Sequence, residues 1–189
     1  MFTIFRGGQS GAWRVTKLAP VKGAGLARTP ALSSVTSSSI ALPILPALTS
    51  WRVAGIASHV RYTERPEKEQ LASVQAKLGR PEATCAALIP IRKSAAWWEL
   101  TQEERRQIFE DKSHHIAASL KYLPAIARQL YHSRDLGEPF DFLTWFEYEP
   151  AQTEAFEELV GTLRATEEWN YVDREVDIRV ERERLDAGS

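Results

Sequence analysis

The sequence predicts an α+β domain with a largely antiparallel sheet and helices on the outer face of that sheet. Segments with strand-like patterns at 84–92, 126–132, 140–149 and 172–180 alternate with segments of helical periodicity. The order reads β-α-β and then α-β-β-α-β, and a short turn at 134–137 joins two of the strands. Sheets of this kind curl into barrels or half-barrels.

The length and charge of the chain limit the number of domains and the kinds of partner it could bind. The chain has 189 residues, and we expect a single domain with an irregular part over 1–50 and an α+β core over 51–182. The 24 Lys and Arg residues balance 25 Asp and Glu residues. This balance argues against a nucleic-acid partner that is held by general electrostatic attraction, which requires a basic excess.

Two further absences in the sequence restrict the class of protein. The single Cys85 excludes an intramolecular disulfide framework and any metal cluster built on cysteine. No run of about 18 apolar residues could span a membrane, and the first 15 residues lack the apolar run of a secretory signal. We therefore expect no membrane partner and a cytoplasmic location.

The N-terminal part contains few periodic segments. Residues 2–6 and 13–18 are predicted to be short strands, and 51–62 a longer one. Residues 19–50 are rich in Ala, Pro, Ser and Gly, and we expect an irregular connection that serves as a structural wrap, a dimer arm or a lid.

A helix is predicted to begin at Pro66, with Leu71, Val74 and Leu78 on its inner face. Gln75 belongs to this apolar stripe. A buried amide needs hydrogen-bond partners, so Gln75 is either satisfied within the core or directed at a polar group in a cavity.

The next helix presents a histidine on its apolar face. Thr101 and Glu104 form a capping box, which predicts a helix from there to about residue 119. At about 100° per residue, His115 lies within about 20° of Ile108, whereas His114 points away. His115 is therefore either a satisfied core residue or a ligand that faces a cavity, as an axial haem ligand would.

The strand at 126–132 contains the most unusual charge in the sequence. Ile126, Arg128, Leu130 and His132 share one face of this strand. A charged group between apolar residues must be paired or must face a cavity. Arg128 is therefore either an ion-paired arginine near the strand end or the cation of a binding site.

The remaining elements complete the predicted core. The strand at 140–149 places Phe140, Phe142 and Phe146 on one face, and Pro150 introduces the last helix. The final strand carries valine and isoleucine on one side and charged residues on the other. Four residues form the apolar stripe of the last helix: Phe156, Leu159, Val160 and Leu163.

Four segments of the chain resemble the chlorite dismutase family, in particular its short, dimeric form. They read IPIRKSAAWW, KSHHIAASLKYLPAIARQLYHSRDLG, FDFLTWFEYEP and LRATEEWNYVDREVDIRVER, and lie between Leu88 and Arg182. The thirteen residues from His115 to Arg128 match the family's spacing of proximal histidine and distal arginine. The resemblance implies a ferredoxin-like α+β barrel, a homodimer and one haem b per subunit.

The same resemblance assigns the proximal side of the haem. His115 would bind the iron, and a carboxylate near the end of the last helix would accept a hydrogen bond from its second nitrogen. Alignment with the family motif selects Glu168, while helical periodicity from Phe156 favours Glu167. Lys93 would join this network, and Trp97 would line the pocket near the haem propionates.

On the distal side, the resemblance implies an enzyme that converts chlorite to chloride and dioxygen. Oxygen transfer to the iron would give a ferryl species and transient hypochlorite, which Arg128 would hold until the two recombine. Gln75 would hydrogen-bond Arg128 and limit its movement. The alternatives are a coproheme decarboxylase-like enzyme, a haem-binding or haem-trafficking protein of the same fold, and a haem-free α+β barrel with a satisfied core His115.

Overall fold

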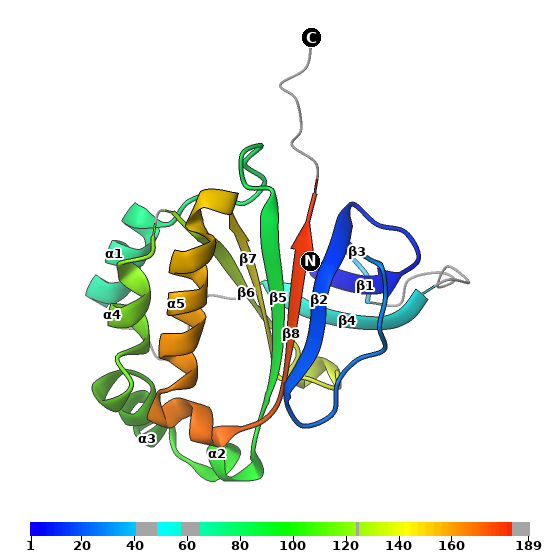
Figure 1. Ribbon diagram of the computed structural model, residues 1–189. Helices are drawn as coiled ribbons and strands as arrows, with labels where there is room; N and C mark the ends of the chain where they lie inside the picture. Colours follow the sequence, from blue (N-terminus) through cyan, green and yellow to red (C-terminus); the bar gives the residue numbers. More distant parts are fainter. Residues whose placement is uncertain (41–48, 58–64, 124, 183–189) are drawn as a thin grey trace.

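The structure is a computed structural model and describes residues 1–40, 49–57, 65–123 and 125–182 (Figure 1). Within these ranges the chain forms eight strands and a set of short helices. The strands are β1 (Phe2–Gly8), β2 (Trp13–Lys22), β3 (Ala31–Ser37), β4 (Thr49–Ala57), β5 (Cys85–Lys93), β6 (Ala127–His132), β7 (Phe142–Tyr148) and β8 (Val172–Glu181).

All strand pairs among the described residues are antiparallel, and the sheet closes on itself in the order β1-β3-β2-β8-β5-β7-β6-β4. Closure depends on a short pairing between β4 and β6, in which Ile56 lies opposite His132. The predicted α+β class and antiparallel sheet are therefore confirmed.

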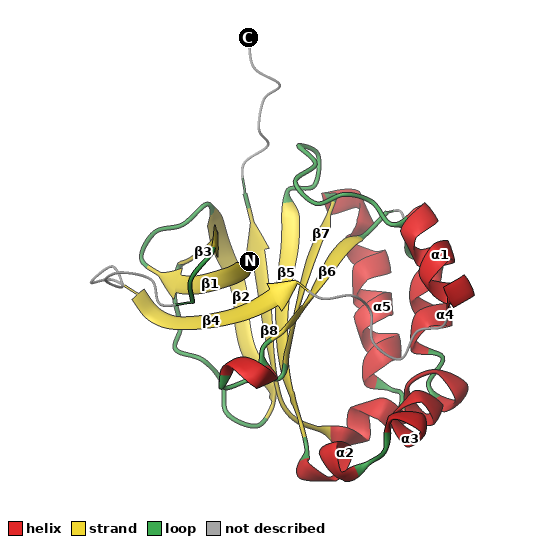
Figure 2. Ribbon diagram, turned by 180° about the vertical axis from the view of Figure 1, so that it is seen from behind, coloured by secondary structure: helices red, strands yellow, loops and turns green. Residues whose placement is uncertain are grey.

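The helices cover one side of the closed sheet (Figures 1 and 2). They are α1 (Arg65–Val74), α2 (Ala95–Glu99), α3 (Gln102–Arg106), α4 (His115–Leu120) and α5 (Thr153–Arg164). Shorter turns are η1 (Gln107–Lys112), η2 (Arg134–Leu136), η3 (Pro150–Gln152) and η4 (Glu167–Tyr171). The sheet consequently has an inner face inside the barrel and an outer face beneath helices.

Each face of the sheet has its own core. An inner cluster includes Trp13, Trp51 and Trp145, and the rings of Trp13 and Trp145 meet edge to face at 5.3 Å. The outer cluster joins the sheet to the predicted stripe of α5, all four residues of which are buried. Phe140 belongs to the inner cluster, not to the outer face with Phe142 and Phe146 as predicted, because it precedes β7 and escapes its alternation.

The expectation of an irregular segment over 19–50 is wrong for most of the described part. β2 continues to Lys22, and β3 pairs with β1 along its full length. The serine-rich β3 has little apolar alternation, so pairing with a neighbouring strand, not burial of one face, defines it. Pro20 is tolerated within β2 because the register shifts beside it. Residues 41–48 lie outside the described residues.

Two other predicted boundaries differ from the structure. The first helix ends at Val74, so Leu78 lies beyond it and packs on the inner cluster. The strand predicted over 51–62 is observed as β4, and 58–62 lie outside the described residues. Within the described part of the chain, we find no helix whose length and hydropathy would let it cross a membrane.

Candidate functional site

A cavity lies between the outer face of β5, β6 and β7 and the layer of α4 and α5. The empty space is about 1100 Å3, including the part that opens to solvent. Pockets of roughly 300–1,000 Å3 hold small molecules and cofactors. Apolar side chains form most of the wall, among them Ile89, Ile91, Phe142, Phe146, Leu159 and Leu163.

A chain of three polar side chains approaches this cavity from the helix side. His115 Nδ1 lies 2.8 Å from Glu168 Oε2, and Glu168 Oε1 lies 2.7 Å from Lys93 Nζ. An ionised carboxylate only accepts hydrogen bonds, so the Nδ1 of His115 carries a proton. In the Nδ1–H tautomer of the neutral ring, Nε2 has the free lone pair. The imidazole therefore has one anchored nitrogen and one that can bind a ligand.

Glu168 is ionised although its side chain is only 5% exposed. Burial by itself would raise the pKa of this carboxyl, but the charge of Lys93 and the His115 hydrogen bond hold it at about 2. Burial lowers the pKa of Lys93, and Glu168 opposes this effect. Each of the two groups therefore stabilises the charged form of the other.

The continuous helix predicted to carry His115 is broken before this residue. The capping box of Thr101 and Glu104 is present, but α3 gives way to the wide π-type turn η1. His114 then adopts a left-handed conformation at φ 48°, and α4 restarts at His115. The buried carboxylate of Glu110 stabilises the start of α4, since it accepts hydrogen bonds from the backbone N–H groups of Ile116 and Ala117.

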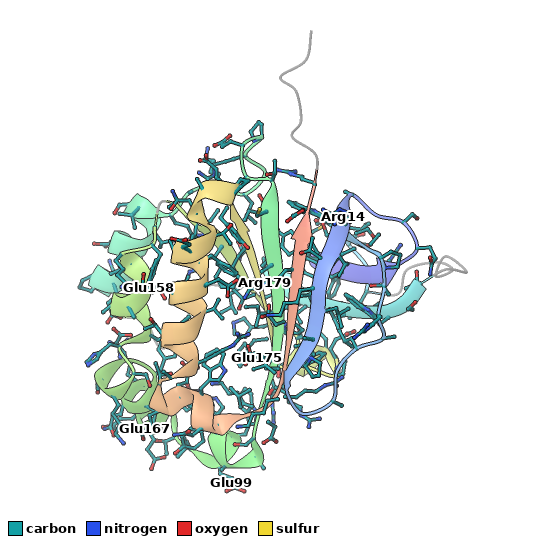
Figure 3. The ribbon with its side chains drawn as sticks, in the orientation of Figure 1. Arg14, Glu99, Glu158, Glu167, Glu175 and Arg179 are labelled. Atoms are coloured by element: carbon teal, nitrogen blue, oxygen red, sulfur yellow. The ribbon has the colours of Figure 1, made fainter. Side chains whose placement is uncertain are left out.

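Of the two candidate carboxylates, Glu168 is the one that contacts His115. Glu167 is largely exposed and pairs instead with Lys112 at 3.1 Å, and Figure 3 shows it at the outer edge of the molecule. α5 ends at Arg164, so both glutamates belong to η4, where the periodicity of the preceding helix no longer applies. The structure thus brings Glu168, the residue that the motif selected, to His115, and leaves Glu167, which periodicity favoured, at the surface.

Trp97 lines the cavity beside the same network. Its ring is buried, and Lys93 Nζ lies 4.4 Å from the centre of the ring. Ser94 caps the helix α2 that carries it. A cation over an indole face is stabilised by the ring quadrupole, so Trp97 helps to keep Lys93 charged.

The opposite wall carries Arg128. On β6, Ile126, Arg128, Leu130 and His132 all line the cavity, which confirms the predicted shared face. Among the described residues, no hydrogen bond or ion pair to the Arg128 guanidinium is found. Burial lowers the pKa of this group without making it neutral at physiological pH. An arginine whose donors have no partner among the described residues is suited to bind an anion in this apolar cavity.

Gln75 contacts Arg128 in a different way from the predicted one. Its Nε2 donates to the backbone carbonyl of Arg128 at 2.6 Å, and the side chain is exposed. Because α1 ends one residue earlier, Gln75 has left the apolar stripe. It therefore fixes the backbone of β6 at this position and does not restrain the guanidinium.

The structure adds cavity residues that sequence reasoning did not select. Phe109 stacks on the ring of His115 at 4.4 Å between centroids. Trp169 and Glu175 also line the cavity. Glu175 was assigned only to the polar side of the last strand, and its buried position could have been suspected from arginines nearby in sequence, such as Arg164.

Several known proteins resemble this chain in sequence and fold. The family model described as chlorite dismutase matches residues 34–183. A dimeric chlorite dismutase from Nitrobacter winogradskyi is 66% identical, with a TM-score of 0.88 over 95% of this chain and 99% of that one. A chlorite dismutase from Candidatus Nitrospira defluvii, solved with imidazole, is 29% identical, with a TM-score of 0.58 over 71% of this chain and 55% of that one.

A chlorite dismutase from Ideonella dechloratans is 42% identical over 62 residues, which are 33% of this chain and 20% of that protein. The match therefore spans one fifth of the length of this curated relative. The family model, in contrast, covers well over half of the chain and starts more than fifty residues before the resembling segments quoted above. The chain belongs to the chlorite dismutase family.

Proposed function

We propose that the protein is a haem b enzyme that decomposes chlorite to chloride and dioxygen. The observation that carries this proposal is the pairing of two opposed groups in one apolar cavity. His115 offers a lone pair from the helix side, and Arg128 offers a positive charge from the sheet side. Family membership supports the same assignment.

The residues of the cavity fit a haem group. Apolar walls suit a porphyrin, and the Nδ1–H of the His115 imidazole is fixed by a carboxylate. A histidine held in this way is a stronger and better oriented iron ligand than a free one. When bound, the haem would supply the iron at which the chlorine–oxygen bond breaks.

Glu168, Lys93 and Trp97 would together set the electron density on the His115 imidazole. Glu168 accepts a hydrogen bond from the Nδ1–H of His115, and Lys93 keeps Glu168 ionised. Trp97 covers the ammonium of Lys93 and excludes water from the pair. Together they hold the imidazole in one tautomer and one orientation.

Arg128 would bind the substrate and retain the reaction fragment. Chlorite carries one negative charge, and its attraction to a guanidinium is far stronger in an apolar cavity than in water. The planar guanidinium of Arg128 would then hold hypochlorite in place until the oxygen of hypochlorite joins the other oxygen of the original chlorite. Chlorite already contains both oxygens of dioxygen and the chlorine of chloride, so the overall reaction needs no general base.

The oligomer and the location stay proposals. The Nitrobacter winogradskyi relative, which this chain matches over nearly its whole length, is described as dimeric. We propose a homodimer for this chain on that ground, and a cytoplasmic location stays a prediction.

Oxygen evolution after addition of chlorite to the haem-reconstituted protein tests the function. We expect a rapid burst on an oxygen electrode, well above that of an equal concentration of free haem. Arg128→Ala should raise the chlorite concentration needed for half-maximal rate and should speed self-bleaching of the haem. Arg128→Lys should retain part of the affinity for chlorite through its charge.

Three outcomes would contradict parts of this proposal. A haem-loaded protein that gives no oxygen would favour a haem-binding or haem-trafficking role. A protein that takes up no haem would favour the haem-free barrel. If Arg128→Ala bleaches no faster than the unchanged protein per turnover, retention of hypochlorite by Arg128 is wrong.

A further inference from the structure

Glu175 is a fully buried carboxylate at the edge of the cavity, outside the His115–Glu168–Lys93 network. Figure 3 shows it in the layer between α5 and the sheet. It lies on β8, where Ile91 is its partner on β5. A buried carboxylate without partners would be strongly unfavourable, so its partners reveal which groups it holds in place.

Both oxygens of Glu175 accept hydrogen bonds. Arg164 donates to Oε1 through Nε at 2.7 Å and through Nη2 at 2.5 Å. Trp169 Nε1 donates to Oε2 at 2.8 Å. A carboxylate can serve these two donors at once because it has two accepting oxygens.

These two donors flank the segment that presents Glu168. Arg164 is the last residue of α5, and Trp169 follows Glu168 directly in the short turn η4. Glu175 therefore ties the end of the helix and the turn to β8. The backbone of Glu168 is held within this closed loop, with Ser113 as a further partner of its N–H at 3.1 Å.

Trp169 also contacts the network from the cavity side. Lys93 Nζ lies 5.6 Å from the centre of the Trp169 ring and 4.4 Å from that of Trp97. Two indole faces thus enclose the ammonium that keeps Glu168 ionised. If the Trp169 ring turned, Lys93 would lose its contact with one of the two indole faces. Glu168 would then lose the fixed position of its neighbour Trp169.

We infer that Glu175 is a positioning residue for the proximal side of the haem, acting through Trp169 on Glu168 and Lys93. This inference rests on the proposed function, because it assumes that His115 binds the haem iron. Loss of the Glu175 contacts should loosen the Glu168–His115 hydrogen bond. A weaker hydrogen bond makes the imidazole a poorer donor and favours ferrous over ferric iron.

Asp177 provides a matched control within the same cluster. It lies two residues further along β8, is equally buried, and pairs with Arg164, Arg179 and Lys17. Unlike Glu175, it is not among the described residues that line the cavity. Asp177→Asn should therefore lower stability as Glu175→Gln does, without an effect on the haem.

The experiment compares the haem-loaded protein with Glu175→Gln, Trp169→Phe and Asp177→Asn. An amide has only one accepting oxygen, so Glu175→Gln leaves either Arg164 or Trp169 without an acceptor. Trp169→Phe removes the donor while leaving the Glu175–Arg164 pair intact. The readouts are the iron–histidine stretching band of the ferrous form, the midpoint potential of the iron and the melting temperature.

We expect Glu175→Gln and Trp169→Phe to lower the iron–histidine stretching frequency. At a fixed potential, we expect the ferrous-to-ferric ratio to rise by roughly threefold, which is about 30 mV for a one-electron couple. Asp177→Asn should leave both quantities unchanged. The stretching band matters because a lost negative charge could raise the potential through space without altering the bond to histidine.

Several results would overturn the inference. An unchanged stretching band in both Glu175→Gln and Trp169→Phe would mean that Glu175 has only a structural role. An equal shift in Asp177→Asn would trace the effect to general loosening of the cluster. If the unchanged protein shows no iron–histidine band at all, the proposed function itself fails, which is a distinct outcome.

Discussion

Replacement of Glu168 by Gln should destabilise the haem-free protein by about 3 kcal/mol at neutral pH. The Lys93–Glu168 pair lies inside the protein, with 2% and 5% of the two side chains exposed. A fall in pKa from 4.5 to about 2 corresponds to about 3 kcal/mol at 1.36 kcal/mol per unit. Removal of one partner of a buried ion pair costs about 3–5 kcal/mol.

We expect the lower end of the range of about 3–5 kcal/mol because Lys93 can lose its proton when Glu168 is replaced. Burial already lowers its pKa, and Glu168 is the largest influence in the opposite direction. Without the carboxylate, the ammonium can release its proton, which limits the cost of an uncompensated charge. At about 2–4 °C per kcal/mol for a chain of this size, the melting temperature should fall by about 6–12 °C.

The pH dependence has a definite sign. The folded-state pKa of Glu168 is depressed, so its contribution to stability is complete above about pH 4.5. The contribution is lost as the pH falls from there towards 2. The difference in stability between the unchanged protein and Glu168→Gln should therefore narrow over that interval, as far down as both proteins remain folded.

Urea unfolding of the haem-free protein at several pH values measures this difference. Glu167→Gln is the matched control, because Glu167 is the neighbouring, largely exposed carboxylate and its replacement should change stability by less than about 0.5 kcal/mol. Lys93→Met combined with Glu168→Gln should recover most of the loss, since both charges are gone. A Glu168→Gln variant as stable as Glu167→Gln at pH 7 would refute the reasoning.

Two further predictions concern the haem ligand and the inner core. His115→Ala should abolish or strongly loosen haem binding, which is seen as a reduced Soret band on titration with haem. His114→Asn should leave haem binding intact, because asparagine tolerates the left-handed backbone at this position. An unchanged Soret spectrum in His115→Ala would exclude His115 as the ligand. Gly7→Ala should lower the free energy of unfolding by about 1–3 kcal/mol, since its Cβ would clash with the Trp51 ring. Gly161→Ala, with open space around it in a helix, should instead stabilise by about 1 kcal/mol, and equal effects would contradict the packing argument.

The sequence predicted the site-bearing elements well because their patterns depend on burial. Alternation on β6 placed Arg128 on the cavity face, and the apolar stripe of α5 was correct at every position. The same reasoning missed β3, which is defined by pairing with β1 and not by an apolar face. It also missed the break before His115, because a carboxylate six residues from Ile116 in the chain, Glu110, caps the restarted helix.

His115 lies at the cavity as predicted, although the intermediate step of that prediction was wrong. The predicted direction assumed an unbroken helix from Thr101, in phase with Ile108. The observed chain widens into η1 and reverses at His114 before α4 begins. The result still places His115 at the cavity, and its identification came from the spacing to Arg128 that the family resemblance supplied.

The polar side of β8 explains why Glu175 was not selected from the sequence. Alternation of valine and isoleucine with charged residues is typical of a strand that is buried on one face and hydrated on the other. Here the second face is also buried, because α5 covers it, and Glu175 and Asp177 are both fully buried. Arginines from α5 and β8 neutralise them, at a desolvation cost that apolar residues would avoid. Of these two carboxylates, Glu175 is the one that reaches the cavity, which is why we place its role at the haem and treat Asp177 as its structural counterpart.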